Sequence, residues 1–246
     1  MHGVILAAGR GSRLGTLTDE MPKGMVPLGS RPLVEWQNAA MKAAGISDVT
    51  VVTGYLGHVF VERGFRTIPN PDWDRGNMVS SLARALDEIP GPLIVSYSDI
   101  VYGPECIRSL LESSASLALT YDRQWLDLWS RRFDKPLTDA ETFRLGSDGT
   151  ITEIGRKAGS VDEIEGQFMG LLKLNIEART WIQDLLMSNS GARLGLDTTA
   201  LLQELIAAGR PLKGVPVDGG WCEVDNLDDL AVAEALVSEG RLTVAD

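Results

Sequence analysis

Short apolar runs alternate with stretches of helical periodicity along most of the chain. The runs at 4–8, 49–53 and 93–97 are rich in Val, Ile and Leu, as are strands that are buried on both faces. Between them, apolar residues recur every three or four positions, which is typical of helices with one buried face. This alternation predicts an α/β fold: a three-layer α/β/α Rossmann-like domain with a mostly parallel, mixed central sheet.

The element boundaries follow from these runs and from the turn residues between them. A glycine at position 45, for example, predicts the end of the helix before it. The predicted strands cover residues 4–8, 49–53, 66–69, 93–97, 117–121, 167–174, 212–216 and 222–224. The predicted helices cover residues 33–44, 78–86, 104–111, 178–187, 197–208 and 227–239.

The middle of the chain breaks the alternation. Residues 122–160 are rich in charge and tryptophan, and 141–145 and 150–154 flank the turn Ser147-Asp148-Gly149, which predicts a hairpin. No repeat, low-complexity tract or long linker divides the sequence. We therefore expect one domain over residues 1–246, with an insert at about 122–165 that covers a substrate.

Composition narrows the class of protein. The 44% hydrophobic and 23% charged residues are ordinary for a globular chain, and no apolar run approaches the roughly 20 residues of a membrane span. A net charge of −11 argues against a nucleic-acid partner. Two cysteines without metal or disulfide spacing suit a reducing compartment, so we expect a cytoplasmic protein, either a monomer or a homodimer.

A glycine-rich turn follows the first predicted strand, in Gly9-Arg10-Gly11-Ser12-Arg13. Such a turn can bring backbone N–H groups close to phosphates, with Arg13 and Lys23 supplying positive charge. The turn is not a dinucleotide-binding fingerprint, because that motif needs a third glycine where this chain has Leu14. It is not a P-loop either, because a P-loop lysine follows a glycine, whereas Lys23 follows Pro22. The turn therefore indicates a different kind of phosphate site.

Three acidic residues lie at the ends of predicted strands. Asp99 follows the strand 93–97, and Glu223 and Asp225 stand two apart at the end of a late strand. Ligands of open α/β sheets bind at this edge, and Mg²⁺ prefers one or two carboxylates together with phosphate oxygens. We expect Asp99 and Asp225 to bind Mg²⁺, with Glu223 as a ligand or as a residue that orients one. The alternative is a set of solvated acids.

The N-terminal string resembles a family signature. Leu6-Ala7-Ala8-Gly9-Arg10-Gly11-Ser12-Arg13-Leu14, with the later Pro-Lys and Pro-Leu pairs, is similar to the motif of the nucleotidyltransferase superfamily that activates phosphorylated small molecules. Strings at 96–102, 139–141, 165–171 and 221–225 resemble its cytidylyltransferase branch. The segment 125–133 resembles relatives that act on phosphonates or phosphorylated amides. The similarity spans essentially the whole chain.

The resemblance implies roles for individual residues. Arg13 and Lys23 would hold the triphosphate, and Lys157 would lie near the reacting phosphates, although a surface position after the hairpin is the alternative. Asn77 and Ser80 would contact the base, while Asn77 could equally cap the helix that begins at residue 78. The backbone and turn residues expected along the nucleotide are Leu6, Ala7, Ala8, Gly9, Gly11 and Ser12.

Two kinds of acceptor site stay open. A quaternary amine would be bound by aromatic faces and an acid, for which Tyr102, Trp125, Trp221 and Glu165 are candidates. An uncharged hydroxyalkyl phosphonate would give more weight to Arg132 and Gln167. Trp125 and Trp129 stand four apart, on one face of a helix, so packing is an alternative for that pair.

These inferences predict an Mg²⁺-dependent cytidylyltransferase that joins CMP from CTP to a small phosphonate or phosphorylated head group and releases pyrophosphate. Examples of the acceptor are 2-hydroxyethylphosphonate, 2-aminoethylphosphonate and phosphocholine. Such a reaction needs no general base, because the attacking oxygen is already ionised. The chain has only two histidines, which agrees with a reaction that does not depend on a histidine base. The alternatives are a sugar-1-phosphate nucleotidyltransferase that uses another nucleotide and a non-catalytic, nucleotide-sensing subunit.

Overall fold

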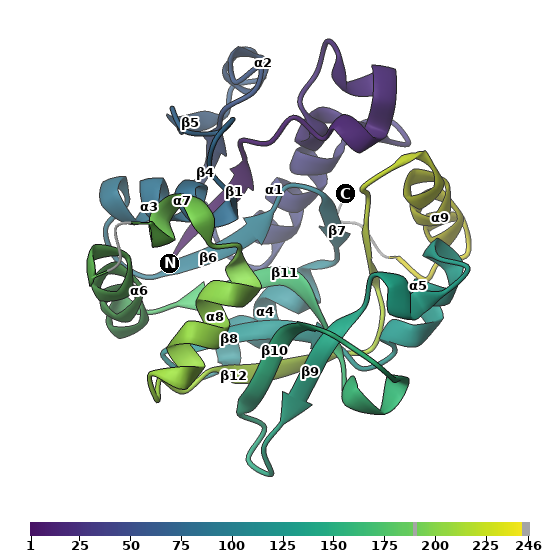
Figure 1. Cartoon of the computed structure of the whole chain (residues 1–246). Coiled ribbons are helices and arrows are strands. Elements are labelled where there is room, and N and C mark those ends of the chain that lie inside the picture. The colour runs from purple at the N-terminus through teal and green to yellow at the C-terminus, as the bar shows by residue number, and fades with distance from the viewer. Residues whose placement is uncertain (189–190, 243–246) are drawn as a thin grey trace.

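A seven-stranded sheet forms the centre of the computed structural model, which describes residues 1–188 and 191–242 (Figure 1). Its strand order is β12-β8-β11-β6-β1-β4-β5, and β11 alone runs antiparallel to its neighbours in this sheet. The strands are β1 (His2–Ala7), β4 (Val49–Thr53), β5 (Arg66–Pro69), β6 (Leu93–Tyr97), β8 (Leu117–Asp122), β11 (Gln167–Leu174) and β12 (Lys213–Val217). The mostly parallel, mixed sheet is as predicted.

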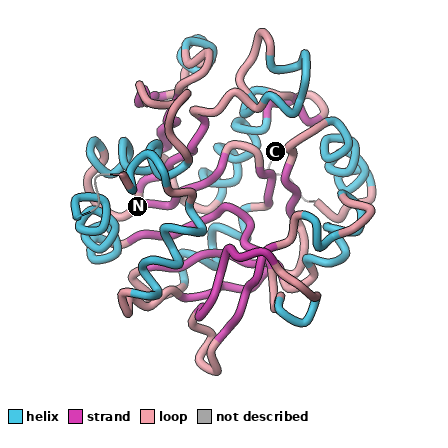
Figure 2. Tube along the Cα trace, viewed as in Figure 1, coloured by secondary structure: helices cyan, strands magenta, loops and turns pink. Residues whose placement is uncertain are grey.

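Helices cover both faces of this sheet (Figures 1 and 2). On one face α1 contacts α4, which packs on β8, β11 and β12. On the other face α3 packs on β1, β4 and β5 and contacts α6 and α8. The bounds are α1 (Leu33–Ala43), α3 (Met78–Glu88), α4 (Pro104–Glu112), α6 (Ile176–Ser188) and α8 (Thr198–Ala207). The three-layer α/β/α fold is therefore confirmed.

Apolar residues and caps explain these elements locally. Val4 and Ile5 of β1 are fully buried between the two helical layers. The side chain of Asn77 accepts a hydrogen bond from the N–H of Met78 and so caps α3, and Asp197 accepts one from Ala200 at the start of α8. The predicted boundaries of these elements lie within two residues of the observed ones.

The insert at 122–165 contains a helix and a hairpin. Its helix α5 (Trp125–Arg132) packs on α9 (Leu227–Ser238), and β9 (Glu141–Leu145) pairs with β10 (Ile151–Lys157) as the predicted hairpin. The hairpin lies against α8. That the whole chain forms one domain stays a prediction.

A small second sheet brings the C-terminal region to the end of β6. The strand β13 (Trp221–Glu223) runs antiparallel to β7 (Ile100–Tyr102), and the N–H of Val224 donates to the carbonyl of Asp99 at 2.8 Å. The sequence pattern did not predict β7, nor the short elements α2 (His58–Glu62), α7 (Ala192–Gly195), β2 (Pro27–Leu28) and β3 (Arg31–Pro32). The pairing of β7 with β13 positions two acidic residues beside Asp99.

No helix in the described ranges 1–188 and 191–242 is both long and apolar enough to cross a bilayer.

Candidate active site

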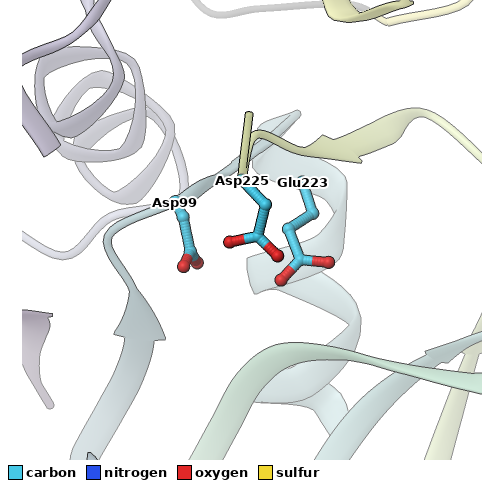
Figure 3. Close-up of side chains that lie close together, drawn as sticks. All are labelled: Asp99, Glu223 and Asp225. Carbon is cyan, nitrogen blue, oxygen red and sulfur yellow. The ribbon is translucent and has the colours of Figure 1, made fainter. Parts of the chain in front are cut away.

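Three carboxylates converge at the carboxyl end of the central strands. Asp99 follows β6, while Glu223 ends β13 and Asp225 lies two residues further on (Figure 3). One carboxylate oxygen from each lies within 4.8 Å of the others. The parallel register of β1 with β6 puts the turn after β1 at the same edge of the sheet.

Lys23 bridges two of these carboxylates. Its Nζ donates to Asp99 Oδ2 at 2.7 Å and also to Asp225 Oδ1, and only 8% of the residue is exposed. Burial alone would lower the pKa of Lys23, but Asp99 and Asp225 outweigh it and hold the pKa above its usual range. The ammonium therefore stays charged at any ordinary pH.

Two arginines offset the negative charge of the three carboxylates. Arg13 binds the Asp225 carboxylate with both Nη atoms, each at 3.0 Å, and most of its side chain stays exposed. Arg132 has no exposed side-chain surface and donates to Glu223 at 2.9 Å and to Asp229 at 2.8 Å. Asp229 in turn accepts a hydrogen bond from the N–H of Asp225 at 3.0 Å. Arg132 therefore supports the acidic residues from behind.

The donor set fits a divalent cation. Asp99 Oδ1 is buried and makes no hydrogen bond within the described residues, whereas Oδ2 of the same carboxylate binds Lys23. Burial raises the pKa of Glu223 to about 7 against the opposing charge of Arg132, and the negative charges of Asp99 and Asp225 add to the rise. Hard carboxylate oxygens that repel one another are the ligands that Mg²⁺ prefers, so the residues present suit this ion.

The glycine turn owes its shape to Gly11. This residue has a φ of +74°, and a Cβ at this position would lie 2.6 Å from the Cβ of Lys23. Gly9 differs, because a Cβ there would meet no atom within 4 Å. Only at Gly11 do both the backbone conformation and the contact with Lys23 require glycine.

We therefore expect Gly11→Ala to lower kcat/KM about 10–100-fold, because the methyl group displaces Lys23 from its position. The measurement is steady-state pyrophosphate release. Gly29→Ala is the matched control, since Gly29 also has a positive φ of +63° but open space around it. Its expected cost is about 1 kcal/mol of stability with unchanged turnover. Equal activity losses in the two variants would contradict the role of the contact with Lys23.

A cavity of about 300 Å³ lies between the carboxylates of Glu223 and Asp225 and the insert. Its lining includes Arg13, Glu223 and Asp225. Residues of the insert and of the start of α8 also line it, and aromatic rings form part of the wall. These further lining residues include Tyr97, Trp129, Asp139, Glu141, Thr142, Phe143, Gln167, Phe168, Asp197, Thr198 and Trp221.

Two aromatic candidates lie outside this cavity, which corrects the expectation that they bind a substrate. Tyr102 is 0% exposed, and its hydroxyl donates to Ser96 Oγ at 3.1 Å in the core beneath β7. Trp125 is also buried and packs edge-on against Trp129, with ring centroids 6.1 Å apart. Trp129 and Trp221 are the tryptophans that line the cavity.

Two charged candidates also lie elsewhere. Lys157 is exposed at the end of β10, and Glu165 is exposed and accepts a hydrogen bond from the N–H of Leu145 at 2.7 Å. Neither residue lines the cavity. Arg132 is enclosed by Glu223 and Asp229 and has no surface left for a substrate, which corrects its expected role as well.

The remaining candidates have structural contacts in this structure. Gln167 lines the cavity but clamps the backbone of Glu141, donating to its carbonyl at 2.6 Å and accepting from its N–H at 3.3 Å. Asn77 caps α3, and Ser80 is buried, donates to the carbonyl of Asn77 and accepts from Asn70. Nucleotide contacts by Asn77, Ser80 and the backbone of β1 stay predictions.

Three acids and one hydroxyl in the lining of the cavity were not among the site residues predicted from the sequence. These residues are Asp139, Glu141, Asp197 and Thr198. Asp139 and Glu141 stood in a string compared with the cytidylyltransferase branch, which was a signal that could have identified them. Asp197 and Thr198 reach the cavity only because α8 packs on β10.

The glycine turn and the carboxylates at the edge of the sheet agree with a nucleotidyltransferase. The chain belongs to the family described as the MobA-like NTP transferase domain, whose model matches residues 3–147.

Curated relatives agree with this assignment. A CTP:phosphoglutamine cytidylyltransferase of Campylobacter jejuni is 37% identical over 254 residues, covering 94% of this chain and 98% of that protein. A 2-aminoethylphosphonate cytidylyltransferase of Lancefieldella rimae is 30% identical over 65% of this chain and 62% of its own length. The resemblance to cytidylyltransferases is thus confirmed.

Solved structures confirm the fold. The CTP:phosphocholine cytidylyltransferase of Streptococcus pneumoniae matches with a TM-score of 0.75 and 19% identity, over 96% of this chain and 98% of that one. The inositol-1-phosphate CTP transferase of T. maritima matches with a TM-score of 0.77 and 19% identity, over 98% of both chains.

Proposed function

We propose that this protein is an Mg²⁺-dependent cytidylyltransferase that transfers CMP from CTP to a small phosphonate or phosphorylated acceptor. The observation that carries the proposal is the convergence of Asp99, Glu223 and Asp225 around Lys23 beside a cavity. The cytidylyltransferase names of the relatives support CTP and a phosphorylated acceptor as the substrates. The cytoplasm and a homodimer, both expected from the sequence, stay predictions.

The reaction needs positioning and charge stabilisation more than acid–base chemistry. An oxygen of the acceptor phosphate or phosphonate attacks the α-phosphorus of CTP, forming a P–O bond, while the bond to the bridging oxygen breaks and pyrophosphate leaves with the electron pair. A phosphate monoester has a second pKa of about 6, so the attacking oxygen is already ionised near neutral pH. Repulsion between the two anions is therefore the main barrier to their approach.

The residues of the site address that barrier. Arg13 is exposed at the cavity wall, where its guanidinium can bind phosphate oxygens. Lys23 keeps a full positive charge between Asp99 and Asp225, close to where the leaving group accumulates charge. Asp99, Asp225 and Glu223 would hold Mg²⁺, which neutralises phosphate oxygens when it is bound.

Pyrophosphate release tests the proposal. The purified chain with Mg²⁺ is given CTP, UTP, GTP, dTTP or ATP, each with 2-aminoethylphosphonate, 2-hydroxyethylphosphonate, phosphocholine or glucose 1-phosphate. We expect release with CTP and at least one of the first three acceptors. Release only with the sugar phosphate and another nucleotide would instead indicate a sugar-1-phosphate enzyme. CTP binding without release from any acceptor would indicate either an acceptor outside this set or a sensing subunit.

A further inference from the structure

We propose that Asp122 is a positioning residue for the reaction, because it fixes the indole of Trp221 and thereby the start of the strand β13, which leads to two of the proposed metal-binding acids. This inference rests on the proposed function and adds a residue to it. Asp122 is the last residue of β8 and does not itself line the cavity. It would therefore act through its contacts with other residues.

The carboxylate of Asp122 accepts hydrogen bonds on both of its oxygens. Oδ1 accepts from the N–H of Gln124 at 2.8 Å and from the N–H of Gly219 at 3.0 Å, and Oδ2 accepts from Trp221 Nε1 at 3.0 Å. The residue is 0% exposed. An asparagine could accept the two backbone N–H groups through its single oxygen, but its amide nitrogen could not accept from the indole. The contact with Trp221 therefore requires a carboxylate at this position.

Asp122 has no ion-pair partner within residues 1–188 and 191–242. The adjacent Arg123 pairs with Asp218 at the surface instead. Burying a carboxylate without a counter-charge costs free energy, whereas hydrogen bonds to a charged acceptor are stronger than those between neutral groups. The three donors offset the cost of burial, and Trp221 is the one side chain among them.

Trp221 connects Asp122 to the cavity. Only 2% of the residue is exposed, and it lines the cavity together with Glu223 and Asp225. The three residues alternate along the chain, as do residues that share one side of an extended segment. Figure 3 shows the carboxylates of Glu223 and Asp225 next to each other. Because β13 spans only Trp221–Glu223, a displacement of the indole reaches Glu223 through a single short strand.

The two ends of β13 are held in different ways. At its end, Arg132 binds Glu223 at 2.9 Å. Its start follows Gly219 and Gly220, which both have a positive φ and carry no side chain that could pack against a neighbour. Asp122 binds the first of these glycines and the indole that follows the second. Asp122 therefore fixes the start of β13, where the turn itself provides no side-chain packing.

A double-mutant cycle tests the contact between Asp122 and Trp221. Asp122→Asn keeps the shape of the side chain but can no longer accept on both sides, and Trp221→Phe keeps a ring but removes the donor. We expect each variant to lower kcat/KM with CTP and the preferred acceptor about tenfold, because a small displacement of positioned groups slows a reaction. The double variant should lose no more than about threefold beyond the larger single loss, since both substitutions break one interaction. Losses that multiply to about a hundredfold overturn the proposal.

A kinetic readout separates positioning from a loss of stability. A variant that is only less stable contains less active protein, so its apparent kcat falls while the KM of each substrate stays the same. Measurements are made at a temperature at which circular dichroism shows both single variants folded. We expect the KM of the acceptor to rise at least about threefold in Asp122→Asn, because Trp221 forms part of the cavity wall. Unchanged KM values overturn the proposal.

A second readout needs no substrate. The indole N–H resonance of Trp221 is assigned by its absence from the NMR spectrum of Trp221→Phe. Its hydrogen should exchange with solvent at least about tenfold faster in Asp122→Asn than in the wild type, because the bond to Oδ2 is lost. An equal exchange rate in the two proteins overturns the proposal.

Asp218→Asn is the matched control. Asp218 directly precedes the same glycine turn and pairs with Arg123, and the two side chains are 49% and 55% exposed. This substitution should change kcat and both KM values less than about twofold, because exposed ion pairs contribute little. Losses equal to those of Asp122→Asn would show that any damage to the turn lowers activity, which contradicts a specific role for Asp122.

Failure of this inference is distinguishable from failure of the proposed function. Wild-type kinetics in Asp122→Asn refute the positioning role and leave the cytidylyltransferase intact. A wild-type protein that neither binds CTP nor releases pyrophosphate refutes the proposed function and, with it, the inference.

Discussion

Replacing Lys23 by methionine is expected to lower kcat/KM about 10²–10³-fold, because one preorganised charge near the leaving group is worth that much in comparable sites. The variant keeps the aliphatic stem, which packs against Gly11, and removes only the ammonium. Steady-state pyrophosphate release with CTP and the preferred acceptor measures the effect. Turnover within threefold of the wild type would contradict a role for Lys23 in the reaction.

The same variant should bind Mg²⁺ more tightly when no nucleotide is present. Lys23 Nζ donates to Asp99 and Asp225, the two aspartates proposed to bind the ion, so lysine and metal compete for the same two carboxylate groups. Thermal unfolding with and without Mg²⁺ therefore should show a larger stabilisation in Lys23→Met than in the wild type. Arg10→Met is the matched control, since Arg10 lies on the same turn but is exposed and pairs with Asp19. Its Mg²⁺ response and turnover should not change.

Local patterns were sufficient to predict the framework of the molecule. The apolar runs that became β1, β4 and β6 are buried, and a strand buried on both faces is rich in apolar residues along most of its length. The glycine turn and Asp99 both follow such strands, so their place at one edge of the sheet followed from the parallel order alone. The glycine turn and Asp99 are neighbours because the strands that precede them are neighbours in the sheet.

The substrate-binding predictions that were wrong concern residues whose surroundings are formed by distant segments of the chain. Tyr102 is enclosed because β13 pairs with β7, and that ladder joins segments more than a hundred residues apart. Arg132 is buried because Asp229 of α9 faces it across the packing of α5. Nothing in the sequence near Arg132 distinguishes it from Arg131, which is a surface residue. The exposure of a charged helix residue is decided by what packs on the helix.

The acids of the insert illustrate the same limit. Asp139 and Glu141 belong to the hairpin region, whereas Asp197 begins α8, and they line one cavity only because α8 packs on β10. Their common place on the wall of one cavity has no signature in the spacing of the sequence.

Arg132→Met is expected to lower the free energy of unfolding by about 3–5 kcal/mol, because removing one partner of a buried charge network leaves the others unpaired. Arg132 has no exposed side-chain surface, and it binds Glu223 and Asp229, the latter also fully buried. Burial alone would lower the pKa of Arg132, but these carboxylates hold it above its usual range, so the lost charge is a full one. Urea unfolding measures the loss.

The adjacent Arg131 provides a matched control on the same helix. It pairs with Glu239 at 3.0 Å on the surface, so Arg131→Met should cost no more than about 1 kcal/mol. The double variant Arg132→Met, Asp229→Asn should recover part of the loss, since Asp229 then no longer carries an unpaired charge. Equal losses for the two arginine variants would contradict the buried network. Asp229 also accepts a hydrogen bond from the N–H of Asp225. Equal losses would therefore also contradict the inference that Arg132 and Asp229 hold the proposed metal-binding acids in place.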